Sequence, residues 1–168
     1  MSERSSPAPY GSYAAIVATF GGLLTAAGAL SRKLDRNPQC QTPLDLAVLS
    51  LATFKAARTL ARDDVTSFIR RPFVHGEPKL VEDEEPVQTG GLDQAIGELV
   101  TCTRCVGTWA AAGLASTQIL APRFGRLLTW SLGAAALNDF LQAAFNATTS
   151  KANELEERAA APPLSRAS

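Results

Sequence analysis

Two cysteines separated by two residues are the side chains of this sequence best suited to chemistry. Cys102 and Cys105 stand in the stretch CTRC, with Arg104 between them, at the edge of a long apolar run. A thiol at the start of a helix is favoured in its reactive thiolate form by the positive helix end, and a neighbouring arginine adds to this effect. The spacing therefore allows thiol–disulfide exchange.

Two other interpretations of the thiol pair remain open. Zinc in a structural site normally has about four protein ligands. The sequence adds only His75, its single histidine, because Cys40 is expected on the opposite side of the molecule. A metal would need a second copy or a carboxylate to complete the set, so we expect no metal and no other cofactor. Cysteine is also a common small buried residue, and the sequence favours this inert role.

A single carboxylate interrupts the last apolar run of the sequence. A charge at the middle of a membrane span costs about 2.5–3.5 kcal/mol on insertion scales, so Asp139 is expected to have a partner. Lys55 and Asp139 lie at nearly equal depth if their helices rise about 1.5 Å per residue, and Arg58 lies one turn nearer the surface. These three residues and Asp64 form a candidate polar cluster. Such a pair can fix helix register or serve a proton-linked carrier.

The elements that must position these groups are apolar runs. A run of about 18 apolar residues is long enough to cross a membrane as a helix, and abundant alanine and glycine allow such helices to pack closely. The sequence therefore predicts an all-α integral membrane bundle, residues 13–148, with a long polar loop between its second and third helices. The predicted transmembrane helices cover about 13–30, 44–61, 99–120 and 127–147. In the first of them, small residues at four-residue spacing predict a packing face: Ala14, Ala18, Gly22 and Ala26.

The segments outside the spans are polar. Residues 1–12 are expected to be a disordered leader, and 149–168 a polar tail into which the last helix continues. In the long loop, Arg70 and Arg71 belong to a short helix that either lies at the membrane surface with its arginines on lipid phosphates or is an ordinary loop helix. An acidic stretch after it is expected to be solvated. The alternative for the first span is a signal peptide cleaved near Ala29.

Four spans place both termini on one side of the membrane. The basic residues near the membrane ends favour a cytoplasmic location for that side, although the short connectors are basic too. We therefore predict a multi-pass protein of the cell membrane with cytoplasmic termini.

At the thiol pair the chain resembles a family of small bacterial membrane proteins catalogued as a domain of unknown function, number 1360. Its pattern is E-L-x-x-C-P-x-C-x-G-x-W opening an alanine-rich span, an upstream arginine, aspartate and R-x-P-F, and a downstream Asp-Phe-Leu. The matching residues, within about 44–145, are Arg58, Asp64, the stretch RRPF with Arg71, Pro72 and Phe73, then Glu98, Leu99, Cys102, Cys105, Gly107 and Trp109, and Asp139, Phe140 and Leu141. Thr103 replaces the proline of the pattern, which leaves the CxxC turn less constrained. The resemblance implies a membrane protein, with sporulation as the setting of some members and no established activity.

The function expected from these features is structural. Equal numbers of acidic and basic residues argue against nucleic acid as a partner, and no nucleophile–base set or phosphate loop indicates an enzyme. We expect a structural or assembly component of a bacterial envelope or spore layer, in contact with the lipid bilayer and with a second copy or another membrane protein. The alternatives are a membrane thiol–disulfide oxidoreductase using Cys102 and Cys105, and a small transporter using Asp139 with Lys55 or Arg58.

Overall fold

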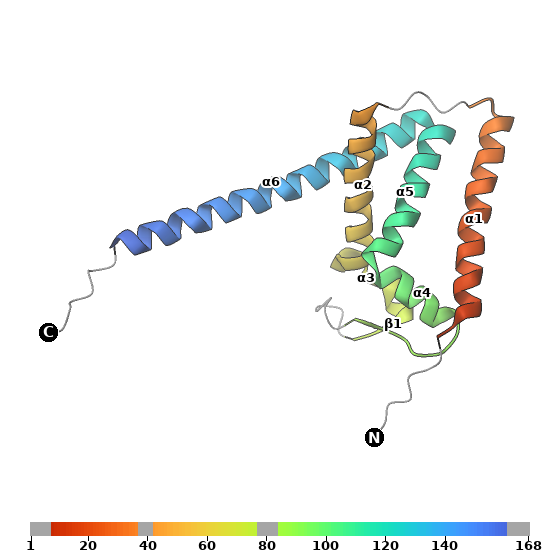
Figure 1. Ribbon diagram of the computed structural model, residues 1–168, viewed down its shortest axis with the longest axis horizontal. Helices are drawn as coiled ribbons and strands as arrows, with labels where there is room; N and C mark the ends of the chain where they lie inside the picture. The colour runs from red at the N-terminus through yellow and green to blue at the C-terminus, as the bar shows by residue number, and fades with distance from the viewer. Residues whose placement is uncertain (1–7, 37–41, 77–83, 161–168) are drawn as a thin grey trace, which may run out of the picture.

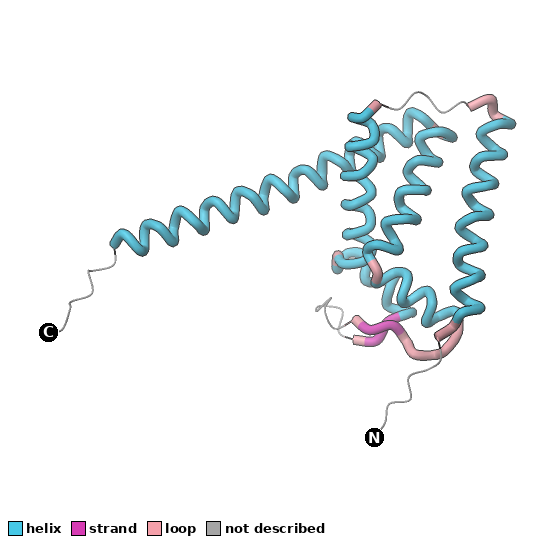
Figure 2. Tube along the Cα trace, viewed as in Figure 1, coloured by secondary structure: helices cyan, strands magenta, loops and turns pink. Residues whose placement is uncertain are grey.

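The computed structural model describes residues 8–36, 42–76 and 84–160, and helices make up most of this part (Figure 2). The long elements are α1 (Tyr10–Lys33), α2 (Pro43–Arg62), α4 (Leu92–Thr101), α5 (Thr103–Leu120) and α6 (Pro122–Ala160). Short elements connect α2 to α4: η1 (Asp64–Thr66), α3 (Ser67–Arg70), η2 (Arg71–Phe73), β1 (Val74–His75) and β2 (Glu85–Pro86), the two strands pairing antiparallel. The all-α class is therefore confirmed, with one two-residue strand pair added.

Three of the long helices alternate in direction along the chain (Figure 1). α1 runs upward in this view, α2 returns, α4 crosses the lower end of the bundle, α5 runs upward again, and α6 starts beside the top of α5. α2 packs against both α5 and α6, whereas α1 contacts α5 and α4. α6 runs at a wide angle to α1, α2 and α5, passes α2, and extends beyond the other helices. Its continuation to Ala160 was expected from the sequence.

Local chemistry explains where the helices begin. Thr42 caps α2 through its hydroxyl, which accepts the amide of Asp45 at 3.2 Å, while the Asp45 carboxylate accepts the Thr42 amide at 3.0 Å. This reciprocal capping box is followed by Pro43, whose fixed backbone suits the first helical position. Pro122 takes the same first position in α6.

Glycine permits the tight turn between α5 and α6. A single residue, Ala121, separates the two helices. A Cβ atom added to Gly125 would lie 2.6 Å from backbone atoms of Gln118, so no larger residue fits there. Gly133 lets α6 approach α2 in the same way, with a Cβ 3.2 Å from the Val48 carbonyl. The short connection expected after residue 120 is therefore present.

The buried positions of this bundle are occupied mostly by small residues, and many large apolar side chains are exposed. The buried apolar residues of the described segments are mostly alanines and include no aromatic ring: Ala52, Ala57, Ala61, Val87, Ala95, Val106, Leu114 and Ala136. Arg70 and Thr129 are the largest side chains that are fully buried. Large apolar residues face outward instead, among them Val17 at 69% exposure, Leu127 at 67% and Phe145 at 69%.

Two expectations about the helices are wrong. The third predicted span, 99–120, is interrupted, because Cys102 has an extended backbone and separates α4 from α5. The small-residue face of the first span does not pack within this chain: Ala14, Ala18, Gly22 and Ala26 are all exposed. α1 meets its neighbours through larger side chains on the opposite face, because Tyr13 and Phe20 reach α4 and α5.

By length and hydropathy, α1 is the one helix in the described residues that passes as a membrane span, and it lies near the N-terminus, where a signal sequence passes the same test. α2 contains Asp45, Lys55 and Arg58 within its apolar stretch. Polar residues such as Arg104 in α5 and Asn138 in α6 interrupt the later runs. The Cys40 connector lies outside the described residues.

Candidate functional site: an arginine-lined cavity beside a thiol pair

The Asp139 carboxylate pairs with Lys55 across the contact between α2 and α6. Lys55 Nζ lies 2.7 Å from Asp139 Oδ2, with both side chains half-buried. Packing continues next to this ion pair. Phe54, the residue before Lys55, stacks on Phe140, the residue after Asp139, with ring centroids 5.3 Å apart. The partner expected from depth is thus found in Lys55, not Arg58. Asp64 takes no part in this pair and lies exposed at the start of η1.

Arg58 lines a cavity between α2 and α5. The cavity has a volume of about 270 Å³ and is lined by Phe54, Ala57 and Arg58 of α2 and by Thr103, Arg104 and Gly107 of α5. Phe54, Arg58 and Arg104 are exposed, so the cavity is open to the surroundings of the chain. No carboxylate lines it. Among the described residues, neither arginine forms an ion pair.

The thiol pair sits at the N-terminus of α5, directly beside the cavity. Cys102 caps the helix, because its Sγ accepts the backbone N–H of Cys105 at 3.3 Å. The two Sγ atoms are 2.6 Å apart, and both cysteines are free. Cys105 is exposed and Cys102 half-buried, so this pair is not packed inside the bundle as the inert interpretation assumed. The geometry brings two thiols within reach of each other and of an outside molecule.

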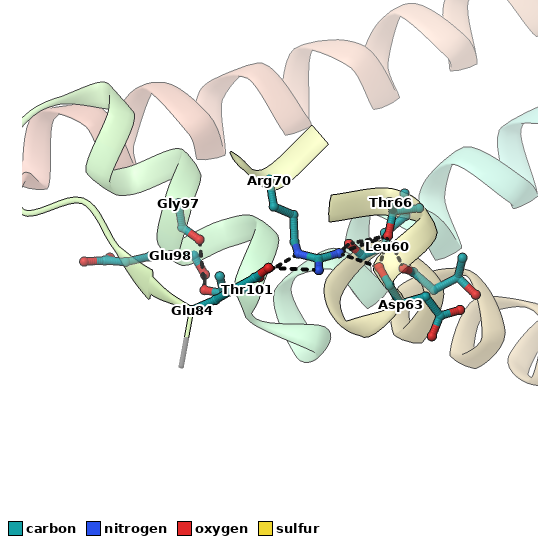
Figure 3. Close-up of polar contacts among 9 residues, drawn as sticks. Leu60, Asp63, Thr66, Arg70, Glu84, Gly97, Glu98 and Thr101 are labelled. Atoms are coloured by element: carbon teal, nitrogen blue, oxygen red, sulfur yellow. Dashed lines mark hydrogen bonds and ion pairs between the residues drawn. The ribbon is translucent and has the colours of Figure 1, made fainter. Parts of the chain in front are cut away.

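Arg70 holds the polar end of the bundle together (Figure 3). Its guanidinium donates to both carboxylate oxygens of Glu84, at 2.8 and 3.2 Å. It also donates to the carbonyl oxygens of Leu60 and Asp63, at 2.9 and 3.1 Å, which satisfies carbonyls left open at the end of α2. Arg70 is completely buried and Glu84 nearly so. A bidentate pair of this kind fixes geometry as well as charge.

This arrangement excludes one of the two interpretations of the loop helix for Arg70, and it corrects the expectation for the acidic stretch. Arg70 points into the protein and does not reach a lipid phosphate, and Glu84 of the acidic stretch is buried where solvation was expected. Arg71, Pro72 and Phe73 of the RRPF stretch were the expected site residues, but Arg71 and Pro72 are exposed. The first arginine of the R-x-P-F pattern corresponds to Arg70. Its place in that pattern was the sequence signal that could have identified Arg70 as a site residue.

The remaining pattern residues make contacts between helices. Glu98 accepts hydrogen bonds from Gln94 at 3.0 Å and from the Tyr13 hydroxyl, which links α4 to α1. Trp109 meets the Phe20 ring edge-on, with centroids 5.0 Å apart. Gly107 faces Ala57 across the cavity floor. These roles are structural.

The end of RRPF packs against a glycine of α4. A Cβ atom added to Gly97 would lie 2.4 Å from the Phe73 carbonyl oxygen. The same oxygen accepts the amide of Val87 at 3.1 Å, which joins the hairpin to this junction. Phe73 is half-buried there. In the described residues no group of three potential metal ligands occurs, and His75 is exposed in β1.

The cavity, the thiol pair and the Arg70 cluster all fall within one stretch of the chain that a family model matches. That model is described as protein of unknown function (DUF1360), and it matches residues 48–145. The chain belongs to the DUF1360 family. The match ends within α6 and excludes α1, so the family unit consists of α2, the polar connection, α4, α5 and the first part of α6.

Two relatives from Bacillus subtilis (strain 168) match this DUF1360 protein. A protein named sporulation protein YjcA is 30% identical over 105 residues, which cover 59% of this chain and 88% of the relative. A protein named UPF0713 protein YngL is 26% identical over 102 residues, covering 60% of this chain and 78% of the relative. No solved structure matches the chain.

Proposed function

We propose that this DUF1360 protein is a multi-pass membrane protein whose four long helices, α1, α2, α5 and α6, cross the bilayer. The observation that supports it is the reversed burial, with alanines inside and large apolar side chains outside. In water this arrangement would expose a large apolar surface, whereas in lipid, helices pack through small residues and present large ones to the acyl chains. α1, α2 and α5 alternate in direction, as consecutive crossings do, and α6 leaves the top of α5 at a wide angle to them (Figure 1).

The few charges in these helices fit the same proposal. A charged residue within a span is tolerated when it pairs or reaches the membrane surface. Lys55 and Asp139 pair with each other. Arg58 lies in the last turns of α2 and Arg104 in the first turn of α5, next to the polar connection, where their long side chains can extend to the surface.

Reporter fusions test this topology. Fusions after Arg36, Gly90 and Ala160 should place Arg36 alone outside the cell, with Gly90 and Ala160 in the cytoplasm. The basic residues near the ends favour this orientation. If Arg36 and Gly90 report the same side, the four-crossing proposal is wrong.

Within the membrane we propose a structural or assembly role, in an envelope or spore layer. Membership in a family of unknown function and similarity to a protein named for sporulation support this setting. The test is complementation of a deletion strain. A Cys102→Ser, Cys105→Ser double variant should restore envelope integrity as well as wild type, because an assembly role needs packing and not thiol chemistry.

A second candidate, a membrane thiol–disulfide oxidoreductase, is favoured by the Cys102 cap and the close Sγ atoms. Pulsed alkylation of membranes, in a Cys40→Ser background, distinguishes the two. An assembly protein should show no disulfide between Cys102 and Cys105 that reforms after reduction. Reformation of that disulfide, together with failed complementation by the double serine variant, would replace the structural role with the redox one.

A further inference from the structure

We propose that the cavity between α2 and α5 binds a phosphate group between Arg58 and Arg104. The two arginines come from different helices and both line one cavity of about 270 Å³. Two like charges that share a cavity repel each other, and an anion between them removes this repulsion. Arginine suits phosphate because its planar fork of N–H donors matches two phosphate oxygens at once.

Other features of the cavity favour an anion. Its lining contains no carboxylate that could neutralise the arginines. Thr103 is the first residue of α5, an 18-residue helix, and the N-terminal end of such a helix is positive. The threonine hydroxyl adds a neutral hydrogen-bond donor. The arginine charges, the N-terminal end of α5 and the Thr103 hydroxyl therefore all favour an anion as the ligand.

The neighbouring charged groups leave the arginines available. Lys55, one turn before Arg58 on α2, is already bound to Asp139. The other buried carboxylate at this end of the molecule, Glu84, is held by Arg70. These two carboxylates are therefore already neutralised by other cations.

The apolar part of the lining indicates which phosphate compound fits best. Phe54, Ala57 and Gly107 supply the apolar part of the lining, beside Thr53, and Phe54 stacks on Phe140. An opening with arginines and an apolar wall suits the headgroup phosphate and upper acyl chain of a phospholipid. This lipid source rests on the proposed membrane insertion, whereas a free phosphate would need only the cavity.

Native mass spectrometry of the purified full chain in detergent tests the proposal. The probes are phosphatidylglycerol, diacylglycerol, which lacks the phosphate, and inorganic phosphate. We expect wild-type protein to retain phosphatidylglycerol and not diacylglycerol. Arg58→Gln and Arg104→Gln should each weaken retention about tenfold, the size expected for one lost charge-assisted contact.

The matched control is Arg62→Gln, which removes the same charge from the next turn of α2 and does not touch the cavity. It should retain the lipid as wild type does. Both cavity arginines are exposed, so their variants should keep the wild-type unfolding temperature, which is measured in parallel.

The outcomes separate the two sources and the two proposals. Retention of inorganic phosphate that depends on Arg58 and Arg104, without lipid retention, supports the site with a free anion as its ligand. Equal retention of either phosphate probe by wild type and both cavity variants, or no retention of any probe, overturns the site. The reporter fusions test the four-crossing topology, and mass spectrometry tests the phosphate site. Each proposal can therefore fail without deciding the other.

Discussion

Arg70 and helix α1 are attached to the same bundle by opposite means. Arg70 is fully buried, and its guanidinium is bound by Glu84 and by carbonyl oxygens at the end of α2. α1 has no buried residue. Its side-chain contacts with the rest of the described chain include one hydrogen bond from Tyr13 and one ring contact from Phe20.

The difference shows how strongly the contacts of the chain itself fix each of these two parts of the molecule. Breaking a buried ion pair from one side costs about 3–5 kcal/mol, whereas an aromatic pair contributes about 0.5–1.5 kcal/mol. The hairpin end is therefore fixed by the chain itself. α1 is held by fewer contacts from the chain itself, and the family match begins at residue 48, after this helix has ended.

The largest expected effect comes from Arg70→Ala. The change leaves Glu84 and two carbonyl oxygens without their donor in a buried setting, so we expect a loss of about 3–5 kcal/mol in the free energy of unfolding. Thermal unfolding of the full chain in detergent, followed by circular dichroism, measures it. The control is Arg71→Ala, an exposed neighbour expected to change stability by less than about 0.5 kcal/mol. Equal effects at the two positions would refute the comparison.

Gly97→Ala tests the same end of the molecule through shape. The added methyl group would lie 2.4 Å from the Phe73 carbonyl oxygen, a backbone atom that cannot move alone. Overpacking of this kind costs about 1–3 kcal/mol. Gly113→Ala is the control, because nothing lies within 4 Å of its added Cβ in α5, and alanine should stabilise that helix by about 1 kcal/mol. Opposite signs in the two unfolding temperatures are expected.

The smallest effect should follow loss of the α1 contact. Phe20→Ala removes the ring that meets Trp109 and should cost about 1 kcal/mol. Leu23→Ala, at a side chain 59% exposed, is the control and should have less effect. The tryptophan fluorescence of Trp109 reports the local change during unfolding, in a Trp130→Phe background. A loss as large as that of Arg70→Ala would mean that α1 is held as firmly as the hairpin.

Helix positions and one contact could be predicted from the sequence, because they depend on periodic and local signals. Apolar runs located the long helices, and counting residues along two of them brought Lys55 and Asp139 to the same depth. The break at Cys102 was missed because an apolar run contains no sign of an extended residue within it. The packing face of α1 was assigned to small residues, whereas Tyr13 and Phe20 make the contacts on the other face.

The sequence by itself determined where the long helices lie and matched the position of Lys55 along α2 to that of Asp139 along α6, since these follow from the regular rise of a helix. Tertiary structure alone decided that Arg70 faces inward and that Arg58 and Arg104 share a cavity. Glu84 is fourteen positions from Arg70, and Arg104 is on another helix from Arg58. The direction in which a charged side chain turns depends on which partner the fold brings near, and that partner is distant in the sequence.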